Sequence, residues 1–322
     1  MRLQAATRGR QVRRQVRIAS QSQGVVSTTI RAPRDPLSLS VAPGTFVSDI
    51  QQHMQPAATF TRVSVPDGML DIHGTHDGKA PRAHQELAQS AAPGAAVING
   101  GYFVHKPGLQ TDCGETIESI GCPVGQVAGR QDFIAIPGPW VSDYGTITAN
   151  GAPVLSGAPL LALEGRSRPI EDADRFQYFI DGKDDPLNRL AGALTHSSNA
   201  NERAAVSLLP TRLSGATKVV LQTLTTGGNR KAGVTMAQWQ TIAELAAQSV
   251  ADALRPGHTG AGASTLNLDG GGSVFLGIRQ IDGVKMLARG GLPDQSVRPV
   301  ANVMISEAGV AGPVPGIRPY SR

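Results

Sequence analysis

Alternation of apolar and polar residues, with turn residues between the runs, divides much of the chain into short strands. We expect strands at 58–65, 69–73, 95–99, 132–136, 146–148, 176–181, 204–209, 218–225, 264–268, 274–278 and 300–305. Pro66-Asp67-Gly68 predicts a hairpin turn between the first two strands, and Asp282-Gly283 predicts a second one. The polar, irregular stretch 183–201 predicts a surface loop.

The clearest helical pattern lies between residues 236 and 254. Apolar residues from Trp239 to Val250 recur at helical spacing there, which predicts that one face of this helix is core. Thr235 and Gln238 fit a capping box, in which each side chain satisfies a free N–H group of the first turn. A shorter helix is expected at 83–92.

Strand candidates outnumber helix candidates and turn signals are frequent. We therefore predict an α+β fold, with a largely antiparallel or mixed β-sheet and packed helices. A single folded domain is expected over 46–310, preceded by a basic, disordered arm and linker over 1–45. A Pro-rich tail is expected at 311–322.

The net charge of +5 comes from the arm. Of the 30 basic residues, eight are arginines within 1–34, where there is no acidic residue; the other 22 face 25 acidic residues, a balance of −3. Such an arm either binds nucleic acid or anionic lipid, or is a solubilising extension. Aromatic residues make up only 4% of the chain, which argues against nucleic acid binding by base stacking.

No apolar run approaches the ~18 residues needed to span a bilayer, so no transmembrane segment is expected. Residues 1–23 also lack the apolar stretch of a signal peptide. The sequence therefore predicts a cytoplasmic protein, or one exported without an ordinary leader.

Two small clusters leave alternatives open. Cys113 and Cys122 form either a local disulfide or two thiols, depending on the redox compartment. His73 and His76, with Asp71 and Asp77 beside them, form either a metal site or the solvated edge of a hairpin.

The chain has no GxxxxGK[ST] phosphate loop, no GxGxxG after a strand, no GxSxG elbow and no HExxH motif. Polar residues instead stand at strand ends beside glycines. Asn99 is followed by Gly100 and Gly101, and Asp269 is followed by Gly270, Gly271, Gly272 and Ser273. Three consecutive glycines allow backbone N–H groups to approach a ligand beside a carboxylate, or they form a glycine-rich hairpin capped by an Asx turn. Arg203, Arg298 and Asn302 also lie at strand ends.

In chain order, these segments resemble the phosphodiester glycosidase family. The resemblance covers 90–306 and is carried by 98–103 (INGGYF), 121–125 (GCPVG), 156–161 (SGAPLL), 203–206 (RAAV), 267–273 (NLDGGGS) and 298–302 (RPVAN). The helix at 236–254 also falls where the family places one, before its DGGGS segment.

The resemblance implies an N-acetylglucosaminidase-like hydrolase that cleaves a sugar-1-phosphodiester at the anomeric carbon. Its substrate would be a GlcNAc-1-phosphate diester or a glycan phosphodiester of a cell wall or exopolysaccharide. Asp269 is the expected nucleophile or base, Glu118 a second carboxylate, and Arg203 the first choice for the phosphate. The expected substrate-binding residues are Asn99, Gly100, Gly101, Gly270, Gly271, Gly272, Ser273, Arg298 and Asn302. No cofactor or metal is required by these motifs, although a carboxylate-rich pocket can hold Ca²⁺ or Mg²⁺.

Two other functions stay open. The same pocket would serve a non-catalytic glycan-binding module, and the arginine arm would serve a protein that binds nucleic acid or a membrane surface. The sequence does not indicate an oligomeric state.

Overall fold

The computed structural model describes residues 16–22, 25–31, 46–66, 68–74, 81–103, 109–110, 116–117, 121–128, 133, 143–170, 197–210, 217–254, 262–291, 298–308 and 314–321. The strand expected at 176–181 lies outside these residues. The strand expected at 132–136 and the loop expected at 183–201 lie mostly outside them.

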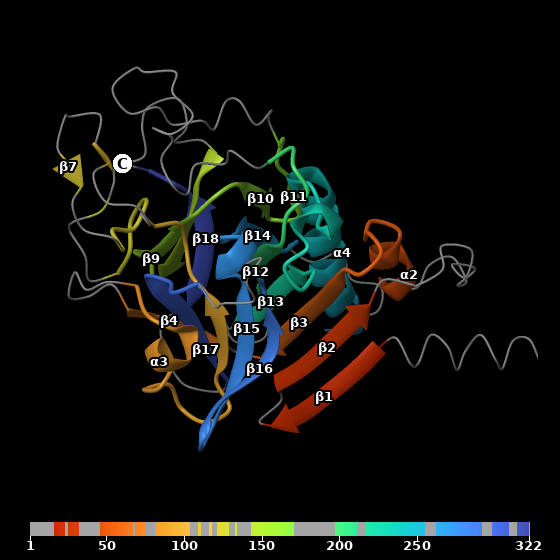
Figure 1. The fold of residues 1–322 in the computed structure, drawn as a ribbon, viewed down its shortest axis with the longest axis horizontal. Helices are drawn as coiled ribbons and strands as arrows, with labels where there is room; N and C mark the ends of the chain where they lie inside the picture. Colours follow the sequence, from red (N-terminus) through yellow and green to blue (C-terminus); the bar gives the residue numbers. More distant parts are fainter. Residues whose placement is uncertain are drawn as a thin grey trace, which may run out of the picture.

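Two large antiparallel sheets form the body of the protein (Figure 1). The eight-stranded sheet contains, in spatial order, β1 (Val16–Ser22), β2 (Val25–Arg31), β3 (Thr59–Val65), β13 (Thr217–Thr225), β12 (Arg203–Pro210), β14 (Ser264–Asn267), β10 (Leu160–Leu163) and β11 (Arg166–Ser167). The five-stranded sheet contains β16 (Gly283–Arg289), β15 (Phe275–Gln280), β5 (Ala96–Asn99), β17 (Asn302–Glu307) and β4 (Met69–Gly74).

Smaller elements complete the described chain. A three-stranded sheet contains β18 (Pro315–Pro319), β8 (Gly145–Ala149) and β9 (Ala152–Gly157), and a two-stranded one contains β6 (Leu109–Gln110) and β7 (Thr116–Ile117). The α-helices are α2 (Phe46–Gln51), α3 (His84–Leu87) and α4 (Met236–Leu254), and the 3₁₀ turns are η5 (Arg230–Ala232) and η6 (Gly271–Ser273). None of the described helices is long and apolar enough to cross a membrane.

The predicted fold class is wrong. Strands take up 48% and helices 16% of the described residues, and every pairing between described strands is antiparallel, so this is a β-rich fold rather than the predicted α+β fold. The helix expected at 83–92 contributed to the error. It is one turn, α3, and the chain from Ala88 to Gly94 runs through turns before β5 begins.

The two sheets pack face to face around the main core. Val63, Val206 and Leu221 of the eight-stranded sheet meet Ile72 and Ile98 of the five-stranded sheet there. Because side chains alternate along a strand, the opposite face of each sheet also carries apolar residues that need cover.

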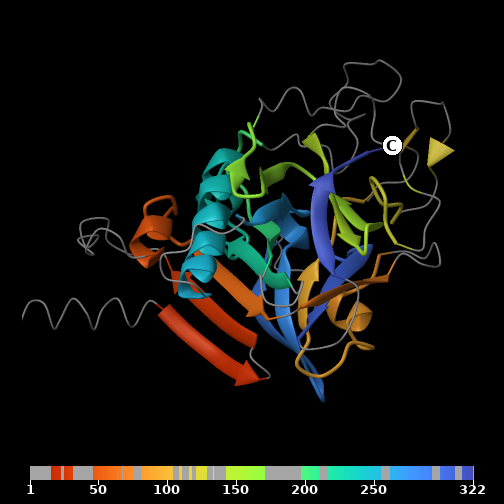
Figure 2. The same cartoon turned by 180° about the vertical axis from the view of Figure 1, so that it is seen from behind.

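Helices supply that cover. On the outer face of the eight-stranded sheet, Phe60 and Leu224 pack against α4 through Trp239 and Ile242, and α4 lies along this face beside α2 in both views (Figures 1 and 2). On the outer face of the five-stranded sheet, Val97 and Val303 belong to one core cluster with Leu87 of α3.

Two of the predicted local elements are confirmed in detail. The helix spans 236–254 as expected, and its capping box is formed: Gln238 N donates to Thr235 Oγ1 at 3.3 Å, and Thr235 N donates to Gln238 Oε1 at 2.9 Å. The hairpin at Asp282-Gly283 is also present, because Gln280 of β15 pairs with Gly283 of β16.

The hairpin expected around Pro66-Asp67-Gly68 is wrong. The strands on either side, β3 and β4, form as predicted but belong to different sheets. β3 pairs with β2 and β13, which occupy both of its edges, so the turn carries the chain from one sheet to the other.

The segments expected as arm and tail contribute strands. β1 and β2 form a hairpin that extends the eight-stranded sheet, and β18 pairs with β8. Ile30 of β2 is fully buried in the cluster beneath α4. The polar, arginine-rich composition of this region did not indicate these strands.

Candidate functional site

Two connecting segments that leave the sheets meet at one point. The NGG segment begins at the last residue of β5 in the five-stranded sheet, and the DGGGS segment lies between β14 of the eight-stranded sheet and β15 of the other. Asp269 N donates to Gly100 O at 3.1 Å, so the two segments are joined directly.

The six segments that carry the family resemblance are brought together here. Three backbone hydrogen bonds connect five of these segments in pairs: Val124 N donates to Tyr102 O (2.9 Å), Gly100 N to Asn302 O (3.1 Å) and Leu268 N to Ala204 O (2.9 Å). The sixth segment is joined through side chains, because the Tyr102 hydroxyl (2.9 Å) and Asn267 Nδ2 (2.7 Å) both donate to Ala158 O. Segments scattered between residues 98 and 302 therefore form one cluster, centred on the NGG and DGGGS segments.

Asn99 fixes the DGGGS segment in place. It is fully buried, its Nδ2 donates to Asp269 O at 2.8 Å, and its Oδ1 accepts Phe275 N at 3.1 Å. One amide thus ties both ends of the segment to β5. Its hydrogen-bonding groups are engaged with the backbone, which indicates a positioning role rather than the substrate contact that the sequence suggested.

Asp269 is half-buried and its carboxylate is held from its own turn. Gly270 N donates to Oδ1 at 2.9 Å. Burial raises the pKa of this carboxyl from 3.8 to about 6, although the Ser273 side chain and the positive charges of Arg298 and Arg230 act in the opposite direction. Desolvation dominates, so Asp269 titrates close to neutral pH, which suits a group that exchanges protons.

Two arginines therefore lie close enough to act on Asp269. Arg298 was expected from the sequence, and Arg230 was not. The guanidinium carbon of Arg230 lies 3.6 Å from where a Cβ on Gly271 would be, an ordinary contact distance, so Arg230 lies directly beside the DGGGS segment. The Nε of Arg230 is buried and has no hydrogen-bond partner among the described residues. No pattern in the surrounding TGGNRKAG sequence distinguishes Arg230 from a surface arginine.

Arg203 is held differently. It is buried, its Nε donates to Val234 O at 3.2 Å, and its Nη2 donates to Asn199 O at 2.9 Å. Burial lowers the pKa of this guanidinium to about 10, with Tyr102 opposing the change. These contacts with backbone carbonyls indicate that Arg203 positions the start of β12.

Asn302 presents an unsatisfied amide to the NGG segment. It is 1% exposed, and neither its Oδ1 nor its Nδ2 has a hydrogen-bond partner among the described residues. Its Oδ1 lies 1.6 Å from where a Cβ on Gly100 would be, so this position requires glycine. Gly101 is equally constrained, because a Cβ there would lie 2.4 Å from Ser156 O. A buried amide without partners is costly, and a ligand that supplies a donor and an acceptor removes that cost.

Glu202 is a second residue that sequence reasoning missed. Its carboxylate is fully buried and accepts hydrogen bonds from Thr226 N (2.7 Å), Thr226 Oγ1 (3.1 Å), Gly228 N (3.4 Å) and Gly291 N (2.9 Å). The backbone carbonyl of Glu202 also accepts Gly271 N at 2.9 Å. A carboxylate saturated by protein donors anchors the surrounding loops and is not a second catalytic group.

His84 supports the DGGGS segment from α3. Its Nε2 donates to Ser273 O at 2.9 Å, and its ring stacks on Phe275 with centroids 4.6 Å apart. Burial lowers the pKa of this imidazole to about 4, although the bond to Ser273 opposes the change. His84 is therefore neutral at physiological pH.

Several predicted groups lie outside the described residues. They include Glu118, Cys113, His76 and Asp77, so the second carboxylate, the disulfide and the metal alternative all stay predictions. Within the described ranges, no group of three or more His, Cys, Asp or Glu residues is placed to hold a metal. A cavity of about 320 Å³ lies between α4 and strands β10, β11 and β14, and none of the predicted site residues lines it.

Comparison with known proteins gives little more. No protein-family model and no curated protein matches the chain. Among solved structures that match, a crystal structure of a Burkholderia pseudomallei protein thought to be exported is 12% identical, with a TM-score of 0.35; the match covers 77% of this chain and 74% of that one. The function is therefore inferred from the chain's own residues.

Proposed function

We propose that this protein hydrolyses a sugar-1-phosphodiester at the anomeric carbon. The substrate is a GlcNAc-1-phosphate diester or a glycan phosphodiester of a cell wall or exopolysaccharide. The observation that supports this most is the clustering of all six family-like segments around Asp269.

The charges around Asp269 fit such a substrate. A phosphodiester departs as a stable anion, so the reaction needs positive charge on the phosphate more than it needs a proton donor. Arg298 and Arg230 both act electrostatically on Asp269, and a planar guanidinium matches phosphate oxygens in pairs. We assign the phosphate to these two arginines and give Arg203 the positioning role.

Asp269 supplies the carboxylate near the anomeric carbon. With a pKa of about 6 it is mostly ionised at pH 7, so it either attacks the carbon or removes a proton from water. The unpartnered amide of Asn302 is suited to a sugar hydroxyl or an acetamido group.

The test compares two substrates that differ only in the leaving group. GlcNAc-1-phosphomethyl carries the phosphate, and p-nitrophenyl α-GlcNAc does not. We expect the wild type to prefer the phosphodiester in kcat/KM, and Arg230→Met and Arg298→Met to lose that preference by at least about 10-fold, because each removes a charge-assisted phosphate contact.

Arg166→Met, which removes an exposed arginine of β11, is the matched control and should keep the preference. Binding of the phosphodiester without release of GlcNAc would indicate a glycan-binding module instead. Equal kcat/KM for both substrates in the wild type would contradict the assignment of the arginines.

A further inference from the structure

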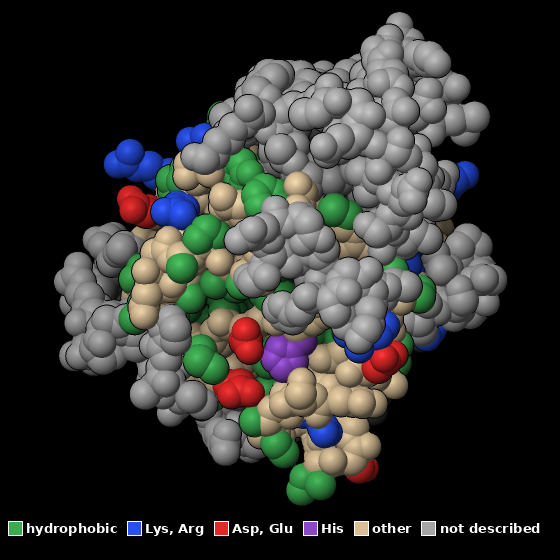
Figure 3. All heavy atoms as spheres, turned by 90° about the vertical axis from the view of Figure 1, so that its left-hand side faces the viewer, with side chains coloured by type: hydrophobic (Ala, Val, Ile, Leu, Met, Phe, Trp, Pro, Cys, Tyr) green, Lys and Arg blue, Asp and Glu red, His purple; other side chains and the backbone are tan. Residues whose placement is uncertain are grey.

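A second group of reactive side chains lies on edge strand β4, on the face turned away from the core. Leu70 and Ile72 point inward, whereas Asp71 and His73 alternate with them and point outward. Figure 3 shows the side of the molecule on which β4 and α3 lie in Figure 1, and a histidine is exposed there among acidic side chains.

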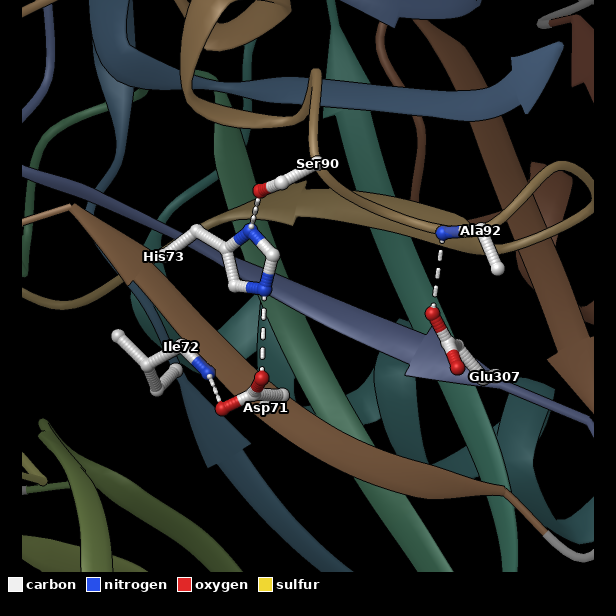
Figure 4. Close-up of polar contacts among 6 residues, drawn as sticks. All are labelled: Asp71, Ile72, His73, Ser90, Ala92 and Glu307. Atoms are coloured by element: carbon white, nitrogen blue, oxygen red, sulfur yellow. Dashed lines mark hydrogen bonds and ion pairs between the residues drawn. The ribbon is translucent and has the colours of Figure 1, made fainter. Parts of the chain in front are cut away.

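Figure 4 shows that Ser90, from the turn after α3, completes a row with these two residues. The Ser90 hydroxyl lies 2.9 Å from His73 Nδ1, and His73 Nε2 lies 3.2 Å from Asp71 Oδ2. With its proton on Nε2, the neutral imidazole donates to Asp71 and accepts from Ser90, so one tautomer satisfies both contacts.

The three side chains differ in their exposure to solvent, and His73 is the least exposed. The His73 side chain is 20% exposed and that of Asp71 62%, while Ser90 is exposed. Asp71 is itself oriented, because its Oδ1 accepts Ile72 N at 2.8 Å. The imidazole is thus held on both sides beneath a hydroxyl that a reagent can reach.

A hydroxyl, a base within hydrogen-bond distance and a third group that orients the base are the elements of an activated nucleophile. We propose that Ser90 is such a nucleophile, with His73 as its base and Asp71 orienting the base, and that it accepts acyl groups from small esters. Asp71 and Glu307, whose Oε1 accepts Ala92 N at 3.2 Å, bring negative charge to this turn, and Arg279, whose Nη2 donates to Gln89 O at 3.2 Å, brings positive charge. Because these charges oppose each other, we expect small neutral esters as substrates, and the site is independent of the reaction proposed at Asp269.

The chemistry balances without a cofactor. Ser90 Oγ attacks the ester carbonyl carbon, and its proton passes to His73 Nδ1 while Asp71 offsets the positive charge of the ring. The ester C–O bond then breaks, and the alcohol leaves with the proton from His73. Water repeats the sequence on the acyl-Ser90 intermediate and releases the carboxylic acid, so ester and water become acid and alcohol.

The test is covalent labelling of the full chain with p-nitrophenyl acetate, followed by intact mass and peptide mapping. We expect one acetyl group on Ser90 and none on Ser90→Ala. His73→Gln should slow the labelling at least about 100-fold, the usual contribution of a general base. Ser198→Ala, which removes another exposed serine, should label like the wild type.

Each other outcome overturns the proposal. An acetyl group found on a residue other than Ser90, equal labelling rates for His73→Gln and the wild type, or neither a label nor release of p-nitrophenolate by the full chain would show that Ser90 is not activated. Circular dichroism of the variants checks that a lost label does not reflect lost structure.

Discussion

The carboxyl of Asp269 is subject to opposing influences in the folded chain. Burial favours its neutral form, while Arg298, Arg230 and the Gly270 N–H favour its charged form. Since the folded pKa of about 6 lies above the usual 3.8, ionisation of this group opposes folding. The stability that the neutral form provides is present below pH 3.8 and is lost as pH rises to about 6.

This linkage predicts the behaviour of Asp269→Asn, which cannot ionise and keeps an acceptor for Gly270 N. At pH 7 the variant should be more stable than the wild type by up to roughly 3 kcal/mol, the free energy that corresponds to the difference between the two pKa values. The gain should disappear toward pH 4. Thermal unfolding of both proteins between pH 4 and 8 measures it, and a gain that does not change with pH would contradict the raised pKa.

The close approach of Gly100 and Asn302 gives a second prediction about single residues. Gly100→Ala places a methyl group on Asn302 Oδ1 and should destabilise the protein by about 1–3 kcal/mol, as overpacking does. Asn302→Ala removes the obstacle, so the double variant should cost less than the sum of the two single variants. Guanidinium unfolding of the four proteins measures the coupling. Strictly additive costs would show that the two groups are not in contact.

Single elements were predictable where the signal was local. The helix at 236–254 could be read from the sequence because its cap, its apolar period and its terminating residues all lie within the segment. The pairing of the strands on either side of Pro66–Gly68 could not be predicted, because turn residues specify a change of direction but not the strands with which β3 and β4 pair. β1 and β2 were missed because four of the seven residues in each are polar. Their place in the sheet depends on the pairing of β2 with β3 and of β1 with β2, which the sequence does not indicate.

The cap of α4 yields a prediction of its own. Thr235→Ala removes the acceptor for Gln238 N and should cost about 0.5–2 kcal/mol in the free energy of unfolding. Thr241→Ala is the matched control, since this hydroxyl only donates back to Ala237 O within the helix, and its cost should stay within about 0.5 kcal/mol. Urea unfolding of both variants measures the difference, and equal costs would contradict the role of the cap.

Across the whole molecule, the N-terminal hairpin is part of the core. Ile30 is fully buried with Phe60 and Trp239, so Ile30→Ala should cost about 2–5 kcal/mol. Thr29→Ala on the same strand should cost far less, because Thr29 is only half-buried. Denaturant unfolding of the two variants measures this, and equal small effects would show that β2 does not pack beneath α4.

The candidate site was predictable in part. Asp269, Gly100 and Asn302 could be found because glycines beside polar residues at strand ends are legible in the sequence, and the structure brings these three together. Arg230 and Glu202 could not be found in this way, because only the fold places η5 and the residue that precedes β12 against the DGGGS segment. For Arg203, the sequence favoured a phosphate contact, whereas its burial and its bonds to backbone carbonyls, which the sequence does not show, favour a positioning role.

We propose that Asp269 carries out the cleavage of a sugar-1-phosphodiester. The most direct measurement is release of GlcNAc from GlcNAc-1-phosphomethyl at pH 7.5 by the wild type, by Asp269→Asn and by Asp282→Asn, an exposed carboxylate in the β15–β16 turn. We predict that Asp269→Asn loses at least about 100-fold in kcat and keeps its fold, while Asp282→Asn retains full activity. Equal release by Asp269→Asn and the wild type would contradict the claim.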